Sequence, residues 1–579
     1  LHLCVCVRER ASMGDAGGVG VKPLSVWRIL GVTAAFAGCQ MAWAVQIGFT
    51  TPELRKLGMS KTWVGYAWLA GPISGMVAQP VVGVWSDHCH SCLGRRRPFI
   101  LSCGLFIILA LILFSNAASL GRLLGDITGQ DTSRGLTLAI VAFWILDFSI
   151  NGVQGLMRAL LADTTPMHQH ALGNSLFSLH NGIGKGLGYL LGSLDLPATL
   201  PFFPTQIQAL YSISAILIAV AVTCTLLCSQ TEVASLSVIG NRARPPAFSC
   251  CAGGGYQSSS SGGHCCSCCS VLCSSFRAVK DMPVAMTRAF WVQFMSYFGW
   301  FCTFVYFTDW VGESVYNGRP SPQGSQQEQD LYEEGIRVAN LGLCLMAISS
   351  SVLVLFHPWL FRRVGPKLLW SISLAVLGVS LILSIFMQSA PSKGVVLLYI
   401  ALQGIPLAAT FSIPWSIVTV CIAEEDAKGP EPEMELQSLA ESALPSQSAV
   451  TAVEGIHAAD SDDEESDDDP EEWLHPPTMT SAPGTVSDAR RDSSSKRGIL
   501  SAAFNMSQCW PEILVSLLCG PIVSLFGGNL TSALVTGGIV TLVGAAMVFY
   551  CKIPTILQGT PSTRPDGARL QLVEESSST

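Results

Sequence analysis

The sequence predicts an all-α integral membrane protein with twelve transmembrane helices, arranged as two bundles of six. Of its 579 residues, 49% are hydrophobic and only 13% are charged, and the mean hydropathy is +0.44. Soluble domains carry roughly 25% charged residues, so this chain has too little polar surface to cover a soluble globule. The apolar residues also gather in runs as long as a spanning helix.

A helix needs about 20 mostly apolar residues to cross the roughly 30 Å hydrocarbon core of a bilayer. Six such runs precede a long polar stretch and six follow it. They lie near 27–49, 63–86, 98–117, 136–161, 171–193 and 207–228, then near 289–309, 335–360, 368–388, 394–420, 498–526 and 530–550. The six-plus-six pattern indicates two homologous halves, an architecture common among secondary carriers.

The runs and the polar stretches between them divide the chain into five parts. These are a cytosolic tail at 1–26, a bundle at 27–228, a cytosolic cysteine-rich loop at 229–285, a second bundle at 286–551 with an acidic insert at 423–496, and a cytosolic tail at 552–579. Residues 1–12 lack a charged segment leading into an apolar core and a cleavage site, so we expect no signal peptide.

The short loops predict the orientation. Basic residues occupy the loop at 95–97, between the second and third runs, and the loop at 362–367, between the eighth and ninth. Both loops lie on one side, and the positive-inside rule places them and both termini in the cytosol. The basic residues at 55–61 lie on the other side, which weakens the asymmetry without reversing it.

Two inserts are low in predicted structure. Residues 246–273 hold seven cysteines amid Gly and Ser, a pattern compatible with S-palmitoylation, with metal capture aided by His264, or with a flexible linker. The spacing matches no zinc module, and we expect no metal site. Residues 423–496 carry ten acids between Asp460 and Glu472, so we expect a disordered cytosolic loop that could recruit cytosolic regulators.

The fourth run carries a polar stripe. Asp147, Asn151, Gln154 and Arg158 follow one another at spacings of four, three and four, so they share one helical face. Ionisable groups cost several kcal/mol at the bilayer centre, and this face should therefore line a central cavity. Asp147 falls near the middle of the span, and Arg158 lies about 16 Å further toward the cytosol at roughly 1.5 Å per residue.

The stripe has two interpretations. Removal from water favours the neutral form of a carboxyl group, so Asp147 could bind and release a proton beside amides suited to sugar hydroxyls. Alternatively, Asp147 belongs to a structural ion pair that locks this helix to a neighbour. Intramembrane acids mark ion pathways by default, which favours the first interpretation.

Lys185 bears on this choice. It lies mid-span in the fifth run, at a depth similar to that of Asp147. A pair between the two would keep Asp147 ionised and oppose proton binding, whereas a lysine that points elsewhere or is neutral leaves proton binding intact. Sequence alone leaves both arrangements open.

Several segments of the sequence resemble those of a known protein family. WAVQIGFTTPELRKLG and WLAGPISGMVAQPVVGVWSDHCHSCLGRRRPFI resemble the plant sucrose–proton symporters and their animal relatives in solute carrier family 45, both of the major facilitator superfamily. The resemblance continues in FWILDFSINGVQGLMRALLAD, FTDWVGESVYNG, YEEGIRVANLGL and GIPLAATFSIPWSIVT. It covers nearly every span, omits the tails and inserts, and implies the major facilitator fold.

The resemblance also implies roles for individual residues. Asp147 corresponds to a proton carrier that also contacts sugar, Arg158 to a residue of coupling, and Asn151, Gln154 and Gln46 to polar positions near the substrate. We expect the sugar ring to pack on aromatic side chains such as Trp43. The residues implied to gate the transporter are Gly83, Asp87, Gly94, Arg95, Arg96 and Arg97 in a cytosolic loop that helps to hold the outward-open state, and Asp309 near the external mouth.

The sequence departs from the plant pattern at three positions that matter. Phe307 stands where the plant pattern has an aspartate, and Lys61 stands where it has a histidine. Lys185 has no counterpart that we recognise, and it is a possible modulator of coupling.

These observations predict a symporter that carries sucrose or a similar sugar together with protons by alternating access, with no cofactor besides the proton. The alternatives are an uncoupled sugar facilitator and a non-transporting sensor or scaffold that acts through the acidic insert. We expect no enzyme activity and no nucleic-acid partner, because no nucleophile–base set, metal cluster or phosphate loop rises above chance spacing. The plasma membrane is the default location, and an acidic vacuole-like organelle would supply the same driving force.

Overall fold

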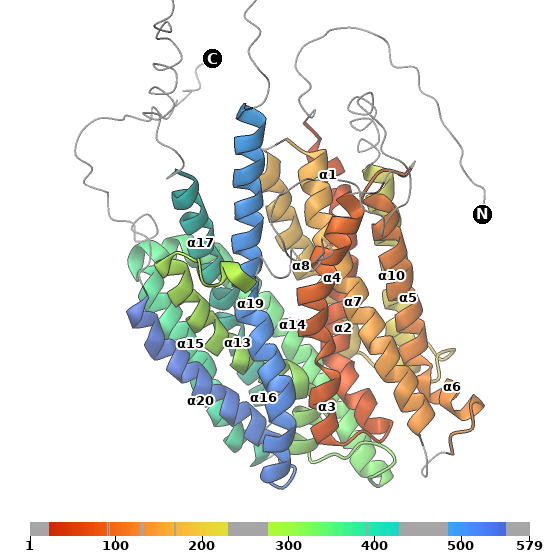
Figure 1. Ribbon diagram of the computed structural model, residues 1–579. Coiled ribbons are helices and arrows are strands. Elements are labelled where there is room, and N and C mark those ends of the chain that lie inside the picture. Colours follow the sequence, from red (N-terminus) through yellow and green to blue (C-terminus); the bar gives the residue numbers. More distant parts are fainter. Residues whose placement is uncertain are drawn as a thin grey trace, which may run out of the picture.

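The computed structural model describes residues 23–87, 89, 91, 93–127, 132–166, 169–229, 276–389, 392–427 and 485–551. Within these residues every regular element is a helix, as the composition predicts. Figure 1 shows the helices running lengthwise in two halves that lie side by side, coloured red to yellow and green to blue. Most of the cysteine-rich loop and the acidic insert, and nearly all of both tails, lie outside the described residues.

Ten helices form the first half. They are α1 (Val26–Val32), α2 (Ala34–Lys56), α3 (Lys61–Ala67), α4 (Ala70–Asp87), α5 (Arg97–Ser115), α6 (Ala117–Leu123), α7 (Ser133–Thr164), α8 (His170–Ser193), α9 (Leu196–Thr199) and α10 (Gln206–Cys228). In this half, α2 packs against α7, α8 and α10, and α5 packs against α7 and α10.

The remaining described helices form the second half. Its helices are α13 (Val284–Trp310), the π-helix η2 (Val311–Val315), α14 (Gln326–Arg363), α15 (Pro366–Leu383), η3 (Ser384–Ser389), α16 (Lys393–Leu402), α17 (Gly404–Ala427), α19 (Thr485–Leu525), α20 (Thr531–Met547) and η5 (Val548–Tyr550). Here α13 packs against α17, α19 and α20, and α15 packs against α20.

All twelve predicted runs coincide with a helix or with two consecutive helices. Within the described residues, nine helical segments are long and apolar enough to span a membrane alone, and the bent pair α1–α2 makes a tenth. The other two predicted runs coincide with α8, which is rich in glycine, and α13, which is rich in aromatic residues.

The structure corrects two details of the prediction. The first run is bent by 43° between α1 and α2, where Thr33 turns its hydroxyl back to the Ile29 carbonyl at 2.9 Å and contacts His180 of α8 at 3.3 Å. The stretch expected to be disordered was also too wide, because α17 continues to Ala427 and α19 begins at Thr485.

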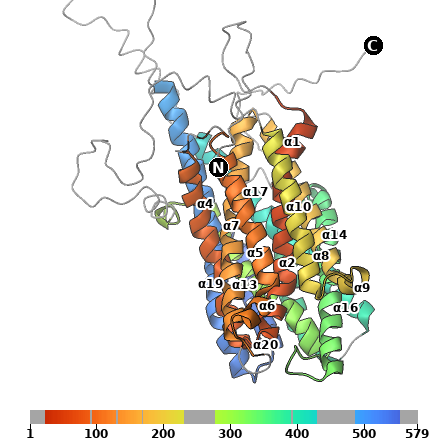
Figure 2. The same cartoon turned by 90° about the vertical axis from the view of Figure 1, so that its right-hand side faces the viewer.

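The two ends of the bundle differ in how the halves meet. We call the end where α4 finishes and α5 begins the cytosolic end, because it carries the arginines at 95–97, and the opposite end the external end. Toward the external end the halves pack directly, α3 and α4 against α19, α2 against α13, and α8 against α14. Figures 1 and 2 show these contacts joining the red-to-yellow half to the green-to-blue half.

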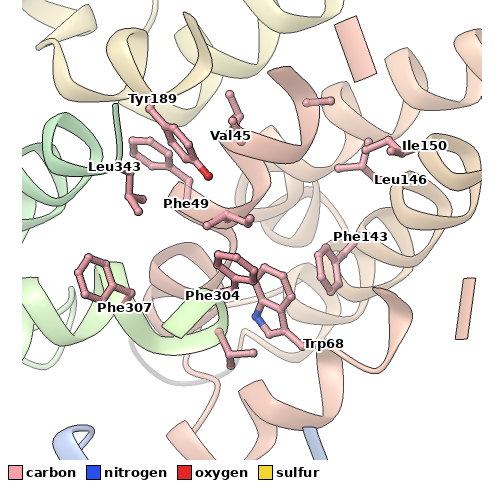
Figure 3. Close-up of a cluster of buried hydrophobic side chains, with 14 of the residues drawn as sticks. Val45, Phe49, Trp68, Phe143, Leu146, Ile150, Tyr189, Phe304, Phe307 and Leu343 are labelled. Carbon is pink, nitrogen blue, oxygen red and sulfur yellow. The ribbon is translucent and has the colours of Figure 1, made fainter. Parts of the chain in front are cut away.

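A buried apolar cluster joins the halves at this level. Figure 3 shows Phe49 of α2, Trp68, and Phe143 of α7 gathered with Phe304 and Phe307 of α13. These side chains expose between 0% and 8% of their surface. The apolar side chains of this cluster therefore close the external side of the interface between the two halves.

Glycines bring α3 and α19 into backbone contact beside this cluster. A Cβ atom at Gly520 of α19 would lie 2.3 Å from the carbonyl oxygen of Thr62, and one at Gly65 of α3 would lie 2.8 Å from that of Ser516. Such contacts require glycine, because any side chain would force the two halves apart.

We therefore expect Gly520→Ala to loosen the external side of the interface. The added methyl group overpacks the contact with Thr62, at a cost of about 1–3 kcal/mol, although it raises the helix propensity of α19. Hydrogen–deuterium exchange of residues 55–67 should become faster in the purified variant. The control is Gly71→Ala on α4, where an added Cβ would meet nothing within 4 Å; equal exchange in both variants would contradict the expectation.

Candidate functional site

Asp147 lies near the middle of α7, on the side of this helix that packs against α2. Its side chain is buried, with 2% exposure, and its Oδ1 atom accepts a hydrogen bond of 2.8 Å from Gln46 Nε2. Both the Oδ2 atom of Asp147 and the Oε1 atom of Gln46 are buried without a hydrogen-bond partner among the described residues. In this pair, Oδ1 of Asp147 and Nε2 of Gln46 are therefore hydrogen-bonded to each other, whereas Oδ2 and Oε1 are not hydrogen-bonded.

Asn151 continues the polar face one turn further along α7. Its amide group donates to Ser74 Oγ at 2.9 Å, and its Oδ1 atom accepts from Gln79 Nε2 at 3.1 Å. Both partners belong to α4, so a polar network links α2, α7 and α4. The sequence analysis did not select Ser74 and Gln79, although polar side chains within an apolar run were the available signal.

Exposure rises along the stripe toward the cytosolic end. Asp147 is buried, Asn151 and Gln154 are half-buried, and Arg158 is exposed. Three turns of one helix therefore lead from a buried carboxylate to an exposed guanidinium. The apolar cluster closes the external end, whereas the stripe becomes more exposed toward the cytosolic end.

Lys185 points at aromatic rings. Its Nζ atom lies 4.6 Å from the ring centroid of Trp43 on α2 and 5.4 Å from that of Phe411 on α17. Cation–π attraction of this kind is strongest over Trp. Asp147 and Lys185 form no ion pair in the part of the chain that the structure describes, and the hydrogen bond to Asp147 comes from Gln46. Of the two arrangements left open by the sequence, the structure shows the one without the pair.

The rings around Lys185 belong to a wider aromatic panel. Trp43 packs edge-on against Phe304 with 5.7 Å between the centroids, and Phe304 stacks on Trp300 at the same distance. Phe411 packs edge-on against Tyr297 of α13 at 6.2 Å. The panel draws residues from both halves, and it adjoins the polar site through Trp43, three residues from Gln46 on α2.

Glu512 is a functional candidate that the sequence analysis missed. It lies on α19, about one turn from Cys509, and is half-buried. The signal was present, since an acid in the run WPEILVSLLCG is as costly as one in the fourth run.

Charged residues of the two halves meet at the external end. Arg55 of α2 lies 3.6 Å from Asp309 of α13 and 3.5 Å from Glu313 of η2, and Lys61 of α3 pairs with Glu313. Lys56 adds a further pair with Glu333 of α14. We call Arg55, Lys56, Lys61, Asp309, Glu313 and Glu333 the external ion-pair cluster.

The structure places Asp309 within this cluster, beneath the external surface and with no exposed area. The Tyr332 hydroxyl donates to its Oδ1 atom at 2.5 Å. Arg55 and Lys61 are the partners of Asp309 and Glu313. The sequence analysis used these basic residues for the orientation of the chain, and Lys61 also as a departure from the plant pattern. Breaking one partner of so buried a pair is costly, because it leaves an uncompensated charge.

The arginines of the cytosolic loop, to which the resemblance implies a gating role, gather around Asp163 at the end of α7. Asp163 was not among the predicted site residues. Arg95 lies 2.8 Å and Arg96 lies 3.0 Å from Asp163, and Arg96 also pairs with Asp87. These ion pairs lie within the first half.

Backbone contacts complete this loop. Arg96 donates to the Gly83 carbonyl at 3.2 Å, and Arg97 donates to the Leu226 carbonyl at 2.7 Å. Gly94 has a φ of +98°, which favours glycine. The structure thus brings the predicted loop residues together at the cytosolic ends of α4, α5 and α7.

Comparisons with known proteins agree with this arrangement. Residues 29–428 match the family model of the Major Facilitator Superfamily. Sucrose transport protein SUT5 of rice (Oryza sativa) is 32% identical over 447 residues, which cover 71% of this chain and 78% of the relative. Sucrose transport protein SUC3 of Arabidopsis thaliana is 28% identical over 480 residues, which cover 72% and 80%.

The fold is also similar to a solved structure, that of the nucleoside transporter NupG. The TM-score is 0.52 at 13% sequence identity, and the match covers 91% of this chain and 99% of NupG. The chain therefore belongs to the major facilitator superfamily, and it is a multi-pass integral membrane transporter rather than an enzyme. Within that superfamily its curated relatives are sucrose transport proteins, and the predicted twelve-span, two-bundle fold is confirmed.

We expect the external ion-pair cluster to be detectable by cross-linking. A carbodiimide joins an amine to a carboxylate only where the two are in contact, so it should link Lys61 to Glu313 and Lys56 to Glu333. With a protease site introduced between 230 and 275, the linked halves should migrate together after cleavage.

The paired variant Glu313→Gln with Glu333→Gln should reduce this linkage several-fold, because no acid remains beside either amine. The charge swap Lys61→Glu with Glu313→Lys should preserve the first link. Glu328→Gln serves as the control, since Glu328 pairs with an arginine that carbodiimide does not couple. Undiminished linkage in the paired variant would contradict the assignment.

Proposed function

We propose that this protein is a proton-coupled secondary transporter that carries sucrose or a similar sugar by alternating access, in the plasma membrane by default. The observation that carries the proposal is Asp147, a carboxylate buried in a membrane span and held by an amide instead of a cation. The sucrose transport proteins among its relatives support the choice of substrate.

Proton binding follows from the unused atoms of the Asp147–Gln46 pair. An ionised carboxylate without a cation is costly inside a membrane, which favours a protonated Asp147. A proton on Oδ2 turns that atom into a donor, and Oε1 of Gln46 is an acceptor without a partner on the residue that already holds Oδ1. Protonation would therefore satisfy two buried atoms at once.

Sugar recognition would use the polar network and the aromatic panel together. Asn151, Gln154, Gln79 and Ser74 supply donors and acceptors for hydroxyl groups. The faces of Trp43 and Phe411 can pack against the apolar faces of a sugar ring, as in other small-molecule sites that combine aromatic walls with a few polar groups.

During alternating access, contacts that close the external end would open and contacts at the cytosolic end would form. The external ion-pair cluster and the apolar cluster hold the halves together in the inward-facing state, and both must open for the outward-facing state. Protonation of Asp147 removes a buried charge and would permit the loaded protein to reorient. In the outward-facing state the loop with Asp87, Arg95 and Arg96 would contact the second half, as rocking between two packed states requires.

The test is uptake of labelled sucrose into proteoliposomes that contain the purified full-length chain. We expect accumulation above equilibrium when the outside is acidic, and its collapse on addition of a protonophore. Equilibration without accumulation would show an uncoupled facilitator. Absence of any flux would favour the sensor or scaffold, whose acidic insert lies outside the described residues.

We expect Asp147→Asn to abolish accumulation while sparing exchange of sucrose for sucrose. The amide mimics a permanently protonated acid, so the loaded protein can still reorient but cannot release a proton. Uptake against a gradient and counterflow, measured in parallel, separate the two activities. Asp281→Asn, a change at an exposed aspartate before α13, should leave both unchanged. Accumulation that survives in Asp147→Asn would refute this role.

We expect Trp43→Ala to raise the KM for sucrose by about tenfold, equivalent to roughly 1.4 kcal/mol, because a stacking face and a cation–π partner of Lys185 are lost together. Trp43→Phe should raise it less. Trp27→Ala, at a tryptophan that is 81% exposed, is the control. A KM unaffected by Trp43→Ala would place the sugar elsewhere.

A further inference from the structure

Glu512 is the intramembrane carboxylate that the proposed cycle leaves without a role. It belongs to α19 of the second half, whereas Asp147 belongs to α7 of the first half. An acid within a membrane span of each half calls for an explanation.

The surroundings of Gly75 show where α7 and α19 approach each other. A Cβ atom at Gly75 of α4 would lie 3.7 Å from Asn151 Oδ1 and 3.7 Å from Cys509 Sγ. The polar face of α7 and the face of α19 that carries Cys509 therefore converge where α4 has no side chain.

The chain directions then fix the depth of the acids. Helix α7 runs toward the cytosolic end and α19 runs toward the external end, where Ser524 contacts Thr62. Asn151 lies one turn to the cytosolic side of Asp147, and Cys509 lies about one turn to the cytosolic side of Glu512. With Asn151 and Cys509 at one level, Asp147 and Glu512 share the next level.

The other titratable groups near Glu512 are neutral or distant. Cys509, one turn away on α19, and Tyr297 of α13 are neutral neighbours of Glu512. Arg158 lies on the polar face of α7, three turns to the cytosolic side of Asp147. On the remaining helices that pack against α19, Lys61 of α3 pairs with Glu313, Asp87 of α4 pairs with Arg96, and Glu424 of α17 is exposed at the cytosolic end.

Helix α20, the last of these neighbours, has no titratable residue in Thr531–Met547. On α13, Arg288 donates to the Tyr550 carbonyl, and Asp309 lies within the external ion-pair cluster. Lys185 is engaged by the rings of Trp43 and Phe411. Among the described residues no cation pairs with Glu512.

Two nearby carboxylates without a cation do not both stay ionised at low cost, so such a pair retains one proton. The buried atoms without partners, Oδ2 of Asp147 and Oε1 of Gln46, provide a place for that proton. We propose that Glu512 is a second proton-binding residue, which shares one proton with Asp147 across the two halves. This inference rests on the proposed function and extends it to the second half.

The shared proton ties protonation to the separation of the halves. With one proton the pair carries a single negative charge, and α7 and α19 can approach. With no proton the two charges repel, which opposes any state in which these helices lie close together. A ligand that binds one arrangement better shifts the equilibrium toward it, and here the proton is that ligand.

The test compares pH profiles. Sucrose binding to the purified full-length protein is followed by tryptophan fluorescence between pH 4 and pH 9, on the order of the range over which carboxyl groups titrate in proteins, and proton-driven uptake is measured in proteoliposomes. Glu512→Gln should move the half-maximal pH of both to more acidic values by about one unit, because the charge that holds the proton on Asp147 is gone. Glu512→Asp keeps a carboxylate and should stay close to the wild type, as should Asp281→Asn.

A second pair of variants separates this inference from the proposed function. If the proton is shared, Asp147→Asn should retain a pH dependence of sucrose binding, and the double variant with Glu512→Gln should lose it. Coincident profiles for wild type and Glu512→Gln, or for the single and double variants, would overturn the inference even if Asp147 drives accumulation. For a variant that does not transport, the pH profile of sucrose binding alone tests the shared proton. Failure of the wild type to accumulate sucrose would overturn only the proposed function.

Discussion

The hydrogen bond from Gln46 to Asp147 joins α2 to α7 at the depth where a membrane protein least tolerates an unpaired charge. The Gln46 amide donates a hydrogen bond to the acid, and Asn151, one turn further along α7, extends the bonding to α4. The orientation of the polar stripe on α7 follows from the hydrogen bond between Gln46 and Asp147. Once Asp147 faces α2, Asn151, Gln154 and Arg158 must line the same inner face, because helical spacing leaves them no other orientation.

The fold was largely readable from the sequence because a bilayer imposes length and apolarity on each span. Runs such as 98–117 and 207–228 correspond closely to α5 and α10. Departures occur where local chemistry overrides apolarity: Thr33 redirects its hydroxyl into the backbone and the first span bends, and the segment from Thr485 forms a helix although it is polar. Apolarity carries no information about either feature.

The site was readable in part, because periodicity reveals which residues share a face but not what opposes that face. The stripe on α7 and the external position of Asp309 followed from spacing and resemblance. The partners did not: Arg55 and Lys61 meet Asp309 and Glu313 across a sequence separation of about 250 residues, and Lys185 turned to aromatic rings of both halves instead of the nearest acid. Glu512 was visible by the rule that singled out Asp147, yet its partner on α7 needed the three-dimensional arrangement.

The external ion-pair cluster has a consequence for the medium in which the protein works. Lys61 and Glu313 keep 18% and 24% of their side chains exposed, so dissolved ions reach this pair, whereas Asp309 is fully enclosed. Mobile ions screen partly exposed charges within a Debye length of about 8 Å at physiological ionic strength. Raising the salt concentration outside the membrane therefore loosens the outer rim of the seal while its enclosed inner pair persists, so the resting preference of the molecule responds to salinity on one face of the membrane.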